Sequence, residues 1–489
     1  MSTLKLTLAA VLLAPALVAQ TPTSTTFTHL GTISVFSTST VGAPEFIGTN
    51  PSAVAWNGSR LWLAGFRNSG SAGAVGIVEV LNPLSGTPSY GTVFGFEAAN
   101  PALRGYSGLD IQGNSLVAAY DSGAAHPNGI TSWNVSTPGS ATSQWAQPAR
   151  GASGVSFDPG FGGVDFGTGW TSFNVARRAL NNSATGTVLY DTTTGFNFQA
   201  TGTTGTLWRD TEFDADTGDI YLRKENDVVR APRTGGNASS GGTLIVSLPE
   251  SGTAGFTAGQ NIAYINSPYG DRLIFNDRPD GSNVQDFFAR VLVTTPTGQP
   301  HTVNWGSFTP VGLSTAWYDF SWDAASGTLA VLDFGTRAVY FFRLEPPTES
   351  FSYCTAGTST NGCNATMSAT GYASATQASP FTLNVSNVEG AKSGIIFYGF
   401  NGPTSQVWNP GSSSFLCVKS PTLRTPSQGS GGSAGSCTGS FTLDWNAWLT
   451  TSSNSYPVGT PLWAQSWYRD PPAPKTTNLS NGLQFFVSP

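Results

Sequence analysis

Four acidic residues are the strongest candidates for chemistry in this 489-residue chain, and they are Asp110, Asp210, Glu212 and Asp319. Several carboxylate oxygens brought together can hold a hard divalent cation, and such an ion can polarise a substrate carbonyl. The alternative is that the acids pair with arginines or with backbone amides, as buried charges must. The arginines in the segments that lead toward these acids are Arg104, Arg150 and Arg209.

The segment from Asp214 to Asp219 superficially resembles a calcium-binding loop. Glu225 stands at the twelfth position counted from Asp214, where an EF-hand has its bidentate glutamate. Gly218 is at the fifth position and Asp219 at the sixth, where an EF-hand requires glycine. A hairpin turn is therefore expected, and a surface calcium ion at this turn stays an alternative.

Triad hydrolysis and zinc proteolysis have little support in the sequence. The three histidines, His29, His126 and His301, are far apart, and no H-E-x-x-H motif is present. No G-x-S-x-G elbow stands between a predicted strand and a predicted helix, and no phosphate-cradling glycine motif opens a helix. His126 could act as a base in a loop, but a lone loop histidine is more often solvated.

Aromatic residues near the C-terminus offer a different chemistry. Flat rings beside polar groups can stack on sugars, whereas β-sandwich cores use the same residues for packing. Trp463 and Trp467 fall on the same side of one predicted strand, because side chains alternate along a strand. The sugar-stacking candidates are Trp463, Trp467 and Tyr468, in a cluster that also includes Trp445 and Trp448.

The four cysteines, Cys354, Cys363, Cys417 and Cys437, all lie in the last third of the chain. An even number of cysteines in an exported protein indicates two disulfides, and three pairings are possible. Short loops close at the lowest entropic cost, which favours pairing Cys354 with Cys363 and Cys417 with Cys437. A zinc site is the rival interpretation, but the spacings do not match the usual zinc knuckles.

The N-terminus predicts export. Residues 1–19 combine Lys5, an apolar run and a small residue before Gln20, as a signal peptide does. The run is too short to cross a bilayer, and no later stretch is long enough. We therefore expect a secreted or envelope-associated protein without a transmembrane segment.

Composition narrows the fold class and the partners. Only 10% of residues are charged, and 58 Gly and 31 Pro indicate many turns, which favours an all-β protein. The net charge of −6 offers no basic surface for nucleic acid. The segment between the signal peptide and Pro346 has a net charge of about −8, which the rest of the chain offsets in part, and this favours cations or neutral ligands there.

A six-fold repeat predicts the architecture that positions the acids. Each copy has an apolar strand, a turn with Asp, Asn or Gln and usually Gly, and a second strand, with a further strand downstream. The turn residues are Asn57, Gln112, Asp158, Asp214, Asn266 and Asp323. Spacings of 46 to 57 residues are typical of propeller blades, so we expect a six-bladed β-propeller over residues 20–345, with residues 27–36 available to close the ring.

This half resembles extracellular six-bladed propellers of the general NHL and lactonase-like type. The resemblance is architectural, and it implies a ligand or metal site where the inner strands converge. Because propellers host many functions, it does not identify a substrate.

A second domain is expected after a stiff linker at residues 346–352, which begins with Pro346-Pro347. Its short alternating strands predict a disulfide-containing antiparallel β-sandwich over residues 353–489. The stretches Tyr353–Gly357, Phe415–Val418 and Trp467–Pro471 resemble a C-terminal module of exported proteins of planctomycete-type bacteria. That resemblance implies export and a β-rich appendage, and attachment to the envelope or to a secreted polymer follows only from its position.

The function expected from the sequence is that of an exported binding or cell-envelope interaction protein that uses a propeller face. One alternative is a metal-dependent, lactonase-like propeller hydrolase that uses the four acids with a divalent cation such as calcium. The other is carbohydrate adhesion through the C-terminal tryptophans. An unknown extracellular ligand, a polysaccharide or an envelope component would be the partner.

Overall fold

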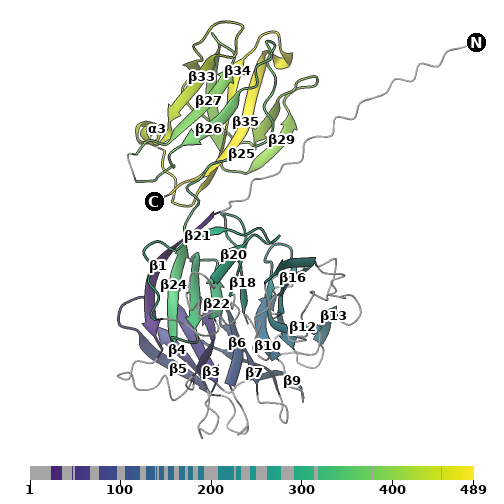
Figure 1. The fold of residues 1–489 in the computed structure, drawn as a ribbon, viewed down its shortest axis with the longest axis vertical. Coiled ribbons are helices and arrows are strands. Elements are labelled where there is room, and N and C mark those ends of the chain that lie inside the picture. The colour runs from purple at the N-terminus through teal and green to yellow at the C-terminus, as the bar shows by residue number, and fades with distance from the viewer. Residues whose placement is uncertain are drawn as a thin grey trace, which may run out of the picture. The chain divides into compact units, whose positions relative to one another are not determined.

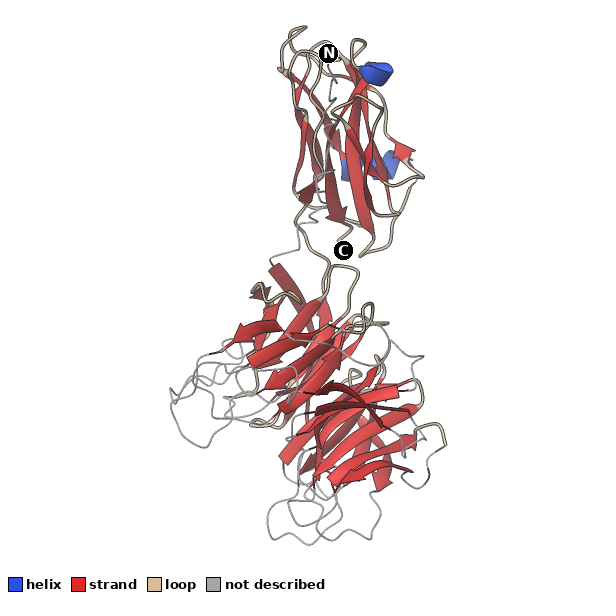
Figure 2. Cartoon of the chain, turned by 90° about the vertical axis from the view of Figure 1, so that its right-hand side faces the viewer, coloured by secondary structure: helices blue, strands red, loops and turns tan. Residues whose placement is uncertain are grey.

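The computed structural model is almost entirely strand, as Figure 2 shows. It describes residues 24–35, 47, 50–66, 76–95, 105–121, 128–137, 139, 142–147, 152–158, 165–170, 174–179, 186–191, 208–224, 227–232, 243–248, 261–276, 291–312, 318–376, 379–452 and 454–488. The predicted signal peptide lies outside these ranges. In the described part of the chain, no helix is long and apolar enough to cross a membrane. Contacts divide the chain into residues 23–344 and a unit that contains residues 345–489.

Small antiparallel sheets make up the first unit, and these are the blades of the propeller (Figure 1). Blades 1 to 4 each have four strands, and the strands follow one another in chain order. Their strands are β2 (Asn50–Trp56), β3 (Arg60–Phe66), β4 (Gly76–Leu81) and β5 (Ser89–Gly95); β6 (Gly105–Gln112), β7 (Ser115–Asp121), β8 (Asn128–Asn134) and β9 (Thr142–Gln147); β10 (Ala152–Asp158), β11 (Asp165–Trp170), β12 (Asn174–Ala179) and β13 (Gly186–Asp191); and β14 (Trp208–Phe213), β15 (Ile220–Lys224), β16 (Asp227–Ala231) and β17 (Thr243–Ser247).

Blades 5 and 6 differ from blades 1 to 4 in the strands that form them. Blade 5 has β18 (Ile262–Ile265), β19 (Arg272–Asn276) and β20 (Val291–Thr294), and blade 6 begins with β22 (Tyr318–Asp323), β23 (Thr328–Asp333) and β24 (Ala338–Leu344). The N-terminal β1 (Ser24–Ser34) pairs with β24 from Phe27 to Ser34. On its other side β1 pairs in parallel with β21 (Thr302–Asn304), which follows β20 in the chain.

The six blades close into a ring. Each inner strand contacts the next in the order β2, β6, β10, β14, β18 and β22, and β22 contacts β2 again. The last blade combines β22–β24 with the N-terminal β1, so both ends of this unit meet in one sheet. This arrangement is the six-bladed propeller that the repeat predicts, with residues 27–34 in the closing strand.

The hairpin turns explain why the repeat carries glycine. Gly58, Gly218 and Gly327 have φ of 84°, 73° and 65°, a left-handed conformation that is strained for other residues. In the third blade, β12 pairs with the hairpin strand β11 on one side and with β13, the fourth strand, on the other. β12 contains two adjacent arginines, Arg177 and Arg178, which hid its strand character.

Apolar residues between adjacent blades hold the ring together. The cluster between blades 6 and 1 contains Trp56, Leu61, Leu63 and Phe341 with their buried neighbours, and the Trp56 and Phe341 rings lie 4.9 Å apart. Trp56 also donates its indole N–H to Thr328 Oγ1 of blade 6 at 2.8 Å. Packing of this kind fixes the positions of the inner strands that carry the candidate acids.

The second unit is a two-sheet β-sandwich. One sheet has the order β25 (Phe351–Tyr353), β35 (Thr477–Phe486), β34 (Pro461–Arg469), β28 (Ser393–Gly399) and β31 (Leu423–Arg424), with β32 (Gln428–Gly429) also paired to β28. The other sheet has the order β26 (Thr366–Thr370), β27 (Thr382–Val388) and β33 (Gly439–Asp444), and β29 (Pro403–Val407) pairs with β30 (Phe415–Val418). The sandwich begins at Phe351, inside the segment predicted to be linker.

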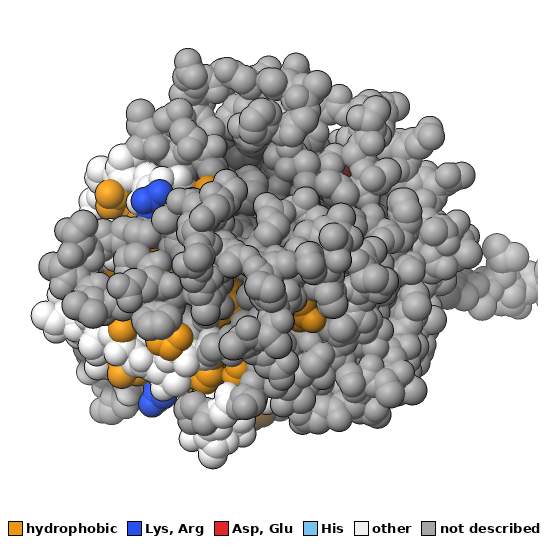
Figure 3. Space-filling view, turned by 90° about the horizontal axis from the view of Figure 1, so that it is seen from below, with side chains coloured by type: hydrophobic (Ala, Val, Ile, Leu, Met, Phe, Trp, Pro, Cys, Tyr) orange, Lys and Arg blue, Asp and Glu red, His pale blue; other side chains and the backbone are white. Residues whose placement is uncertain are grey.

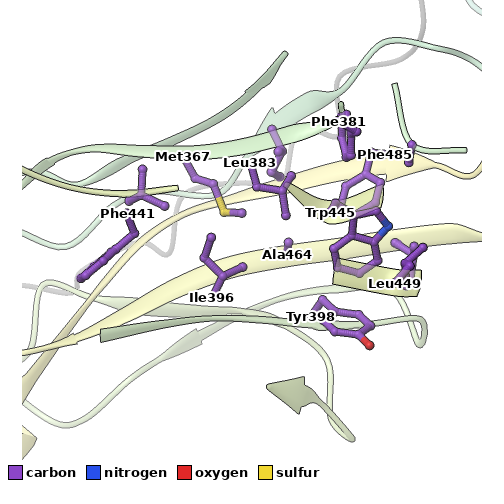
Figure 4. Close-up of a cluster of buried hydrophobic side chains, with 14 of the residues drawn as sticks. Met367, Phe381, Leu383, Ile396, Tyr398, Phe441, Trp445, Leu449, Ala464 and Phe485 are labelled. Atoms are coloured by element: carbon purple, nitrogen blue, oxygen red, sulfur yellow. The ribbon is translucent and has the colours of Figure 1, made fainter. Parts of the chain in front are cut away.

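A short helix, α3 (Trp445–Ser452), completes the sandwich core. Figure 4 shows Trp445 among Phe381, Tyr398 and Phe485, and its indole ring lies 4.6 Å from the ring of Tyr398. The sequence pattern predicts no helix at these residues. Trp445 and Leu449 face the core because residues four apart lie on the same side of a helix.

The disulfides differ from the favoured pairing. Cys354 is bonded to Cys417, and Cys363 to Cys437, with Cα–Cα distances of 6.1 and 5.3 Å. The prediction from short loop closure was wrong, because the folded sheets decide which cysteines become neighbours. All four cysteines are paired, as the even count predicted.

Candidate functional site

The four candidate acids lie on inner strands of alternate blades. Asp110 is on β6 of blade 2, Asp210 and Glu212 are on β14 of blade 4, and Asp319 is on β22 of blade 6. Asp210 and Asp319 are buried, at 7% exposure each, while Asp110 and Glu212 are partly exposed. The inner strands thus bring acids that are far apart in the sequence into one ring.

Each aspartate accepts a hydrogen bond from the backbone of the next blade. Asp110 Oδ2 accepts from Phe157 N at 2.7 Å, Asp210 Oδ2 from Ile262 N at 3.0 Å, and Asp319 Oδ2 from Val54 N at 2.6 Å. The second oxygen of each accepts from the amide of the residue that follows it, and these amides belong to Ile111, Thr211 and Phe320. We call these three aspartates the blade clasps, because each links two blades.

Two further polar residues extend the same pattern. Asn261 donates its amide to Asp319 Oδ1 at 2.8 Å, and Ser321 Oγ accepts from Trp56 N at 2.9 Å. Glu212 differs from the clasps, because its hydrogen bond is to the Ser156 hydroxyl, at 3.4 Å from Oε2. Among the described residues, Glu212 is therefore the ring acid with the weakest hydrogen bonding.

Burial shifts the titration of all four acids. It raises the pKa of Asp110 to about 6 and that of Asp210 to about 7, although backbone N–H donors oppose both shifts. It also raises the pKa of Glu212 and Asp319 well above their usual values, and the charge of Asp210 adds to both shifts. The protonation of each acid near neutral pH therefore depends on that of the others.

This geometry differs from a preformed metal cage. Among the residues that the structure describes, the group that brings three possible ligand atoms within 4.8 Å of one another is Asp214, Asp216 and Asp271, and the ring acids do not form such a group. Asp214 and Asp216 lie in the predicted hairpin turn, where Asp214 Oδ1 accepts from Asp216 N at 2.8 Å. Asp271 accepts from the Tyr264 hydroxyl at 2.8 Å. These carboxylate oxygens accept hydrogen bonds from nearby residues, and they are also possible metal ligands.

The predicted arginines are not placed by this structure. Arg104 and Arg150 lie outside the described residues, and so does the side chain of Arg209. Arg223 on β15 was not predicted, yet it is fully buried and donates to Asn276 O at 2.9 Å. Its charge lowers the pKa of Asp210. A signal was present in the sequence, since Arg223 interrupts an apolar strand.

The sugar-stacking candidates do not form an exposed platform. Trp463 is 9% exposed and Tyr468 fully buried, and they belong to different hydrophobic clusters. Trp467 is partly exposed, with the Arg469 guanidinium 5.3 Å from its ring centroid. The expectation of neighbouring exposed rings therefore fails for Trp463 and Tyr468, because Tyr468 packs in the sandwich core and Trp463 packs in a second cluster that includes Tyr353.

The histidines do not assemble a triad among the described residues. His126 lies outside them, and the partly exposed His29 hydrogen-bonds to Thr32 at 2.8 Å. The string from Gly431 to Gly435 has the spacing of a nucleophile elbow around Ser433. It lies in a loop before β33 and leads into no helix, so it lacks the strand–turn–helix setting of such an elbow.

Comparison with known proteins transfers no function to the chain. No family model matches it, and no curated protein matches it. Among solved structures, an auxiliary nutrient binding protein from Bacteroides thetaiotaomicron is similar at 13% identity and a TM-score of 0.42, covering 61% of this chain and 70% of that one. An aldose sugar dehydrogenase from Streptomyces coelicolor is similar at 11% identity and a TM-score of 0.40, covering 66% of this chain and 100% of that one.

A third structure, the Cps50 (Swd1) β-propeller domain of Myceliophteria thermophila, is similar at 10% identity and a TM-score of 0.37, covering 60% of this chain and 96% of that one. None of these likenesses is strong enough to carry an argument about function. The chain's own strand pairing defines its class: it is an all-β protein, a six-bladed propeller followed by a disulfide-containing sandwich.

Proposed function

We propose that this chain is an exported binding protein whose propeller holds a ligand without transforming it. The observation that carries the proposal is the use of the ring acids as blade clasps. Asp110, Asp210 and Asp319 each use carboxylate oxygens to accept from backbone amides of their own and the next blade. Acids engaged in this way stabilise the ring and are poorly placed to bind a metal together.

Export fits the rest of the molecule. Two disulfides cross-link the sandwich, and such bonds persist in oxidising compartments. The signal-like residues 1–19 support the same location. The sandwich, with its resemblance to a C-terminal module of planctomycete-type exported proteins, would present or attach the propeller at the envelope or on a secreted polymer.

The test combines metal content with turnover. Residues 20–489 would be purified, their metal content measured, and hydrolysis of nitrophenyl esters and lactones assayed with and without added Ca²⁺, Mn²⁺ or Zn²⁺. We expect no stoichiometric metal, no turnover above background and an unchanged melting temperature after chelation. A stoichiometric ion together with turnover that Asp210→Asn abolishes would overturn the proposal.

A metal-dependent, lactonase-like hydrolase is the second candidate, and one observation favours it. Neighbouring carboxyls with strongly raised pKa values cluster at catalytic sites more often than elsewhere. In that case Glu212, which has the weakest hydrogen bonding of the four acids, would be the first ligand or base to test. Loss of turnover in Glu212→Gln with retained folding would support this candidate.

A further inference from the structure

A pocket of the propeller lies where two neighbouring strands separate. β20 and β21 begin as a hairpin, with a bridge between Thr294 and Pro300 and a bond from His301 N to Val293 O at 2.9 Å. Beyond that point β21 leaves β20 and pairs with β1. Figure 1 shows β21 beside β1, with β20 next to them.

Aromatic packing holds the departing strand away from blade 5. Trp305 follows β21 directly, and its ring stacks on Phe27 of β1 at 4.8 Å and meets Phe342 of β24 at 4.9 Å. Trp305 is 6% exposed, so this part of the chain packs against blade 6. The separation of β20 from β21 is therefore a stable feature of the fold.

The space at this separation has a volume of about 640 Å³, and we call it the fork pocket. Its apolar walls come from three parts of the propeller: β17 and the residue after it, blade 5, and β21 with its flank. The wall residues include Val246, Leu248, Phe275, Val291, Val303 and Trp305. No Asp, Glu, Lys or Arg among the described residues lines it, and its size falls in the range of small-molecule sites.

Two polar atoms of the lining have no hydrogen-bond partner among the described residues. They are Thr294 Oγ1 and His301 Nε2, and both atoms are buried. Thr294 is only 4% exposed. Buried polar groups are normally paired, so two unpaired ones in an apolar pocket point to a ligand with a polar group.

The other ring nitrogen of His301 indicates what Nε2 offers. Nδ1 lies 2.7 Å from Thr25 Oγ1, and that oxygen accepts from Arg272 Nε at 2.8 Å. When the Thr25 hydroxyl donates to Nδ1, the imidazole proton lies on Nε2. Burial, and then the charge of Arg272, lower the pKa of His301 to about 4, although a hydrogen bond with the Ser24 backbone opposes them, so the ring is neutral at pH 7.

We propose that the fork pocket binds an uncharged aliphatic molecule with one carbonyl group. Its oxygen accepts a hydrogen bond from the Nε2–H of His301, while the apolar walls surround its hydrocarbon chain. The proposal rests on the binding function above and adds the site and the ligand class. Charged analogues are disfavoured, because a pocket without ionised groups cannot compensate their desolvation.

The probe is 2-decanone, and decanoate is its charged counterpart. Calorimetric titration of residues 20–489 at pH 7.5 should show saturable binding of 2-decanone, with decanoate at least about tenfold weaker. His301→Ala should weaken binding of the ketone by about tenfold, the equivalent of one hydrogen bond. His29→Ala, at another described histidine, should leave affinity unchanged.

A pocket-filling variant, Val291→Trp, supplies an independent readout and should abolish binding while the melting temperature confirms folding. Absence of saturable binding, or affinities unchanged in both pocket variants, overturns the assignment of the fork pocket. The proposed binding function fails separately, if δ-decalactone is hydrolysed by the wild-type chain. The two failures are therefore distinguishable.

Discussion

At the scale of single residues, the blade clasps are largely buried carboxyl groups that also link neighbouring blades. A buried carboxylate is costly, and hydrogen bonds from backbone amides compensate part of that cost. Asp319 shows this most fully, since it accepts from Val54 N, Phe320 N and the side chain of Asn261. Its contribution is therefore structural whatever the propeller binds.

Replacing this clasp should destabilise the propeller. In Asp319→Ala, Val54 N–H and the Asn261 amide lose their acceptor while staying buried, which costs about 2–4 kcal/mol of unfolding free energy. Urea denaturation of the propeller measures this change. Asp216→Ala, at an exposed turn, is the matched control, and an equal loss in both variants would contradict the clasp role.

The same acids predict a pH dependence. The pKa of Asp110 is about 6 and that of Asp210 about 7 in the folded chain, both above the value near 4 of an unfolded aspartate. The stability they contribute is present below about pH 4 and is lost as pH rises through 6 and 7.

We therefore expect a higher melting temperature at pH 5 than at pH 8, measured by differential scanning fluorimetry. Asp210→Asn should make the curve flatter, because an amide does not titrate. A melting temperature that rises steadily from pH 5 to pH 8 would be inconsistent with these shifts.

At the scale of elements, β1 decides whether the ring is closed. It covers the edge of β24 from Phe27 to Ser34 and receives β21 on its other side. Without it, β24 would become an exposed sheet edge and the apolar residues of blade 6 would lose their cover.

A chain that begins at Val35 should therefore melt at least about 10 °C lower than one that begins at Thr23, or aggregate on purification, because a 1 kcal/mol loss shifts melting by several degrees. Size-exclusion chromatography and thermal melting compare the two. Equal melting temperatures would show that β1 is dispensable.

The disulfides stabilise the sandwich at the same scale. The Cys363–Cys437 bond spans 74 residues, and cross-links over long loops restrict the unfolded chain most. Cys363→Ala/Cys437→Ala should lower the unfolding free energy of the sandwich by about 2–5 kcal/mol, measured by pulse proteolysis in urea. Stability matching the wild type, with the double variant still soluble, would argue against this role.

At the scale of the whole molecule, charge and surface agree with an uncharged ligand. The propeller half carries most of the negative charge. Figure 3 looks at one end of the propeller, where the described atoms between the grey ones are hydrophobic or uncharged, with small patches of Lys or Arg atoms. The net negative charge does not favour an anionic polymer as the partner.

Export can be tested on the full chain. Expressed with its own N-terminus in a Gram-negative host, the protein should reach the periplasm and start near Gln20, because residues 1–19 have the regions of a signal peptide. Intact-mass measurement of the periplasmic fraction reads the cleavage site. A chain that stays cytoplasmic with residues 1–19 attached would contradict the proposed location.

The repeat and the composition were enough to predict the fold class, since hairpin turns and alternating strands are local properties. The spacing of Asn57, Gln112 and the later turn residues predicted six blades, and the acids of the inner strands were recognised as a group. These features depend on neighbours in the sequence, where period and turn chemistry leave a readable signal.

Tertiary structure alone decided the pairings between distant segments. Cys354 and its disulfide partner Cys417 are 63 positions apart, and His301 lies beside Thr25 across 276 positions. The pairing of β21 with β1 is another contact between segments that are far apart in the sequence. No local pattern encodes such contacts, because they follow from how complete sheets pack. For the same reason the four acids could be found in the sequence, while the role of three of them as clasps between blades required the ring itself.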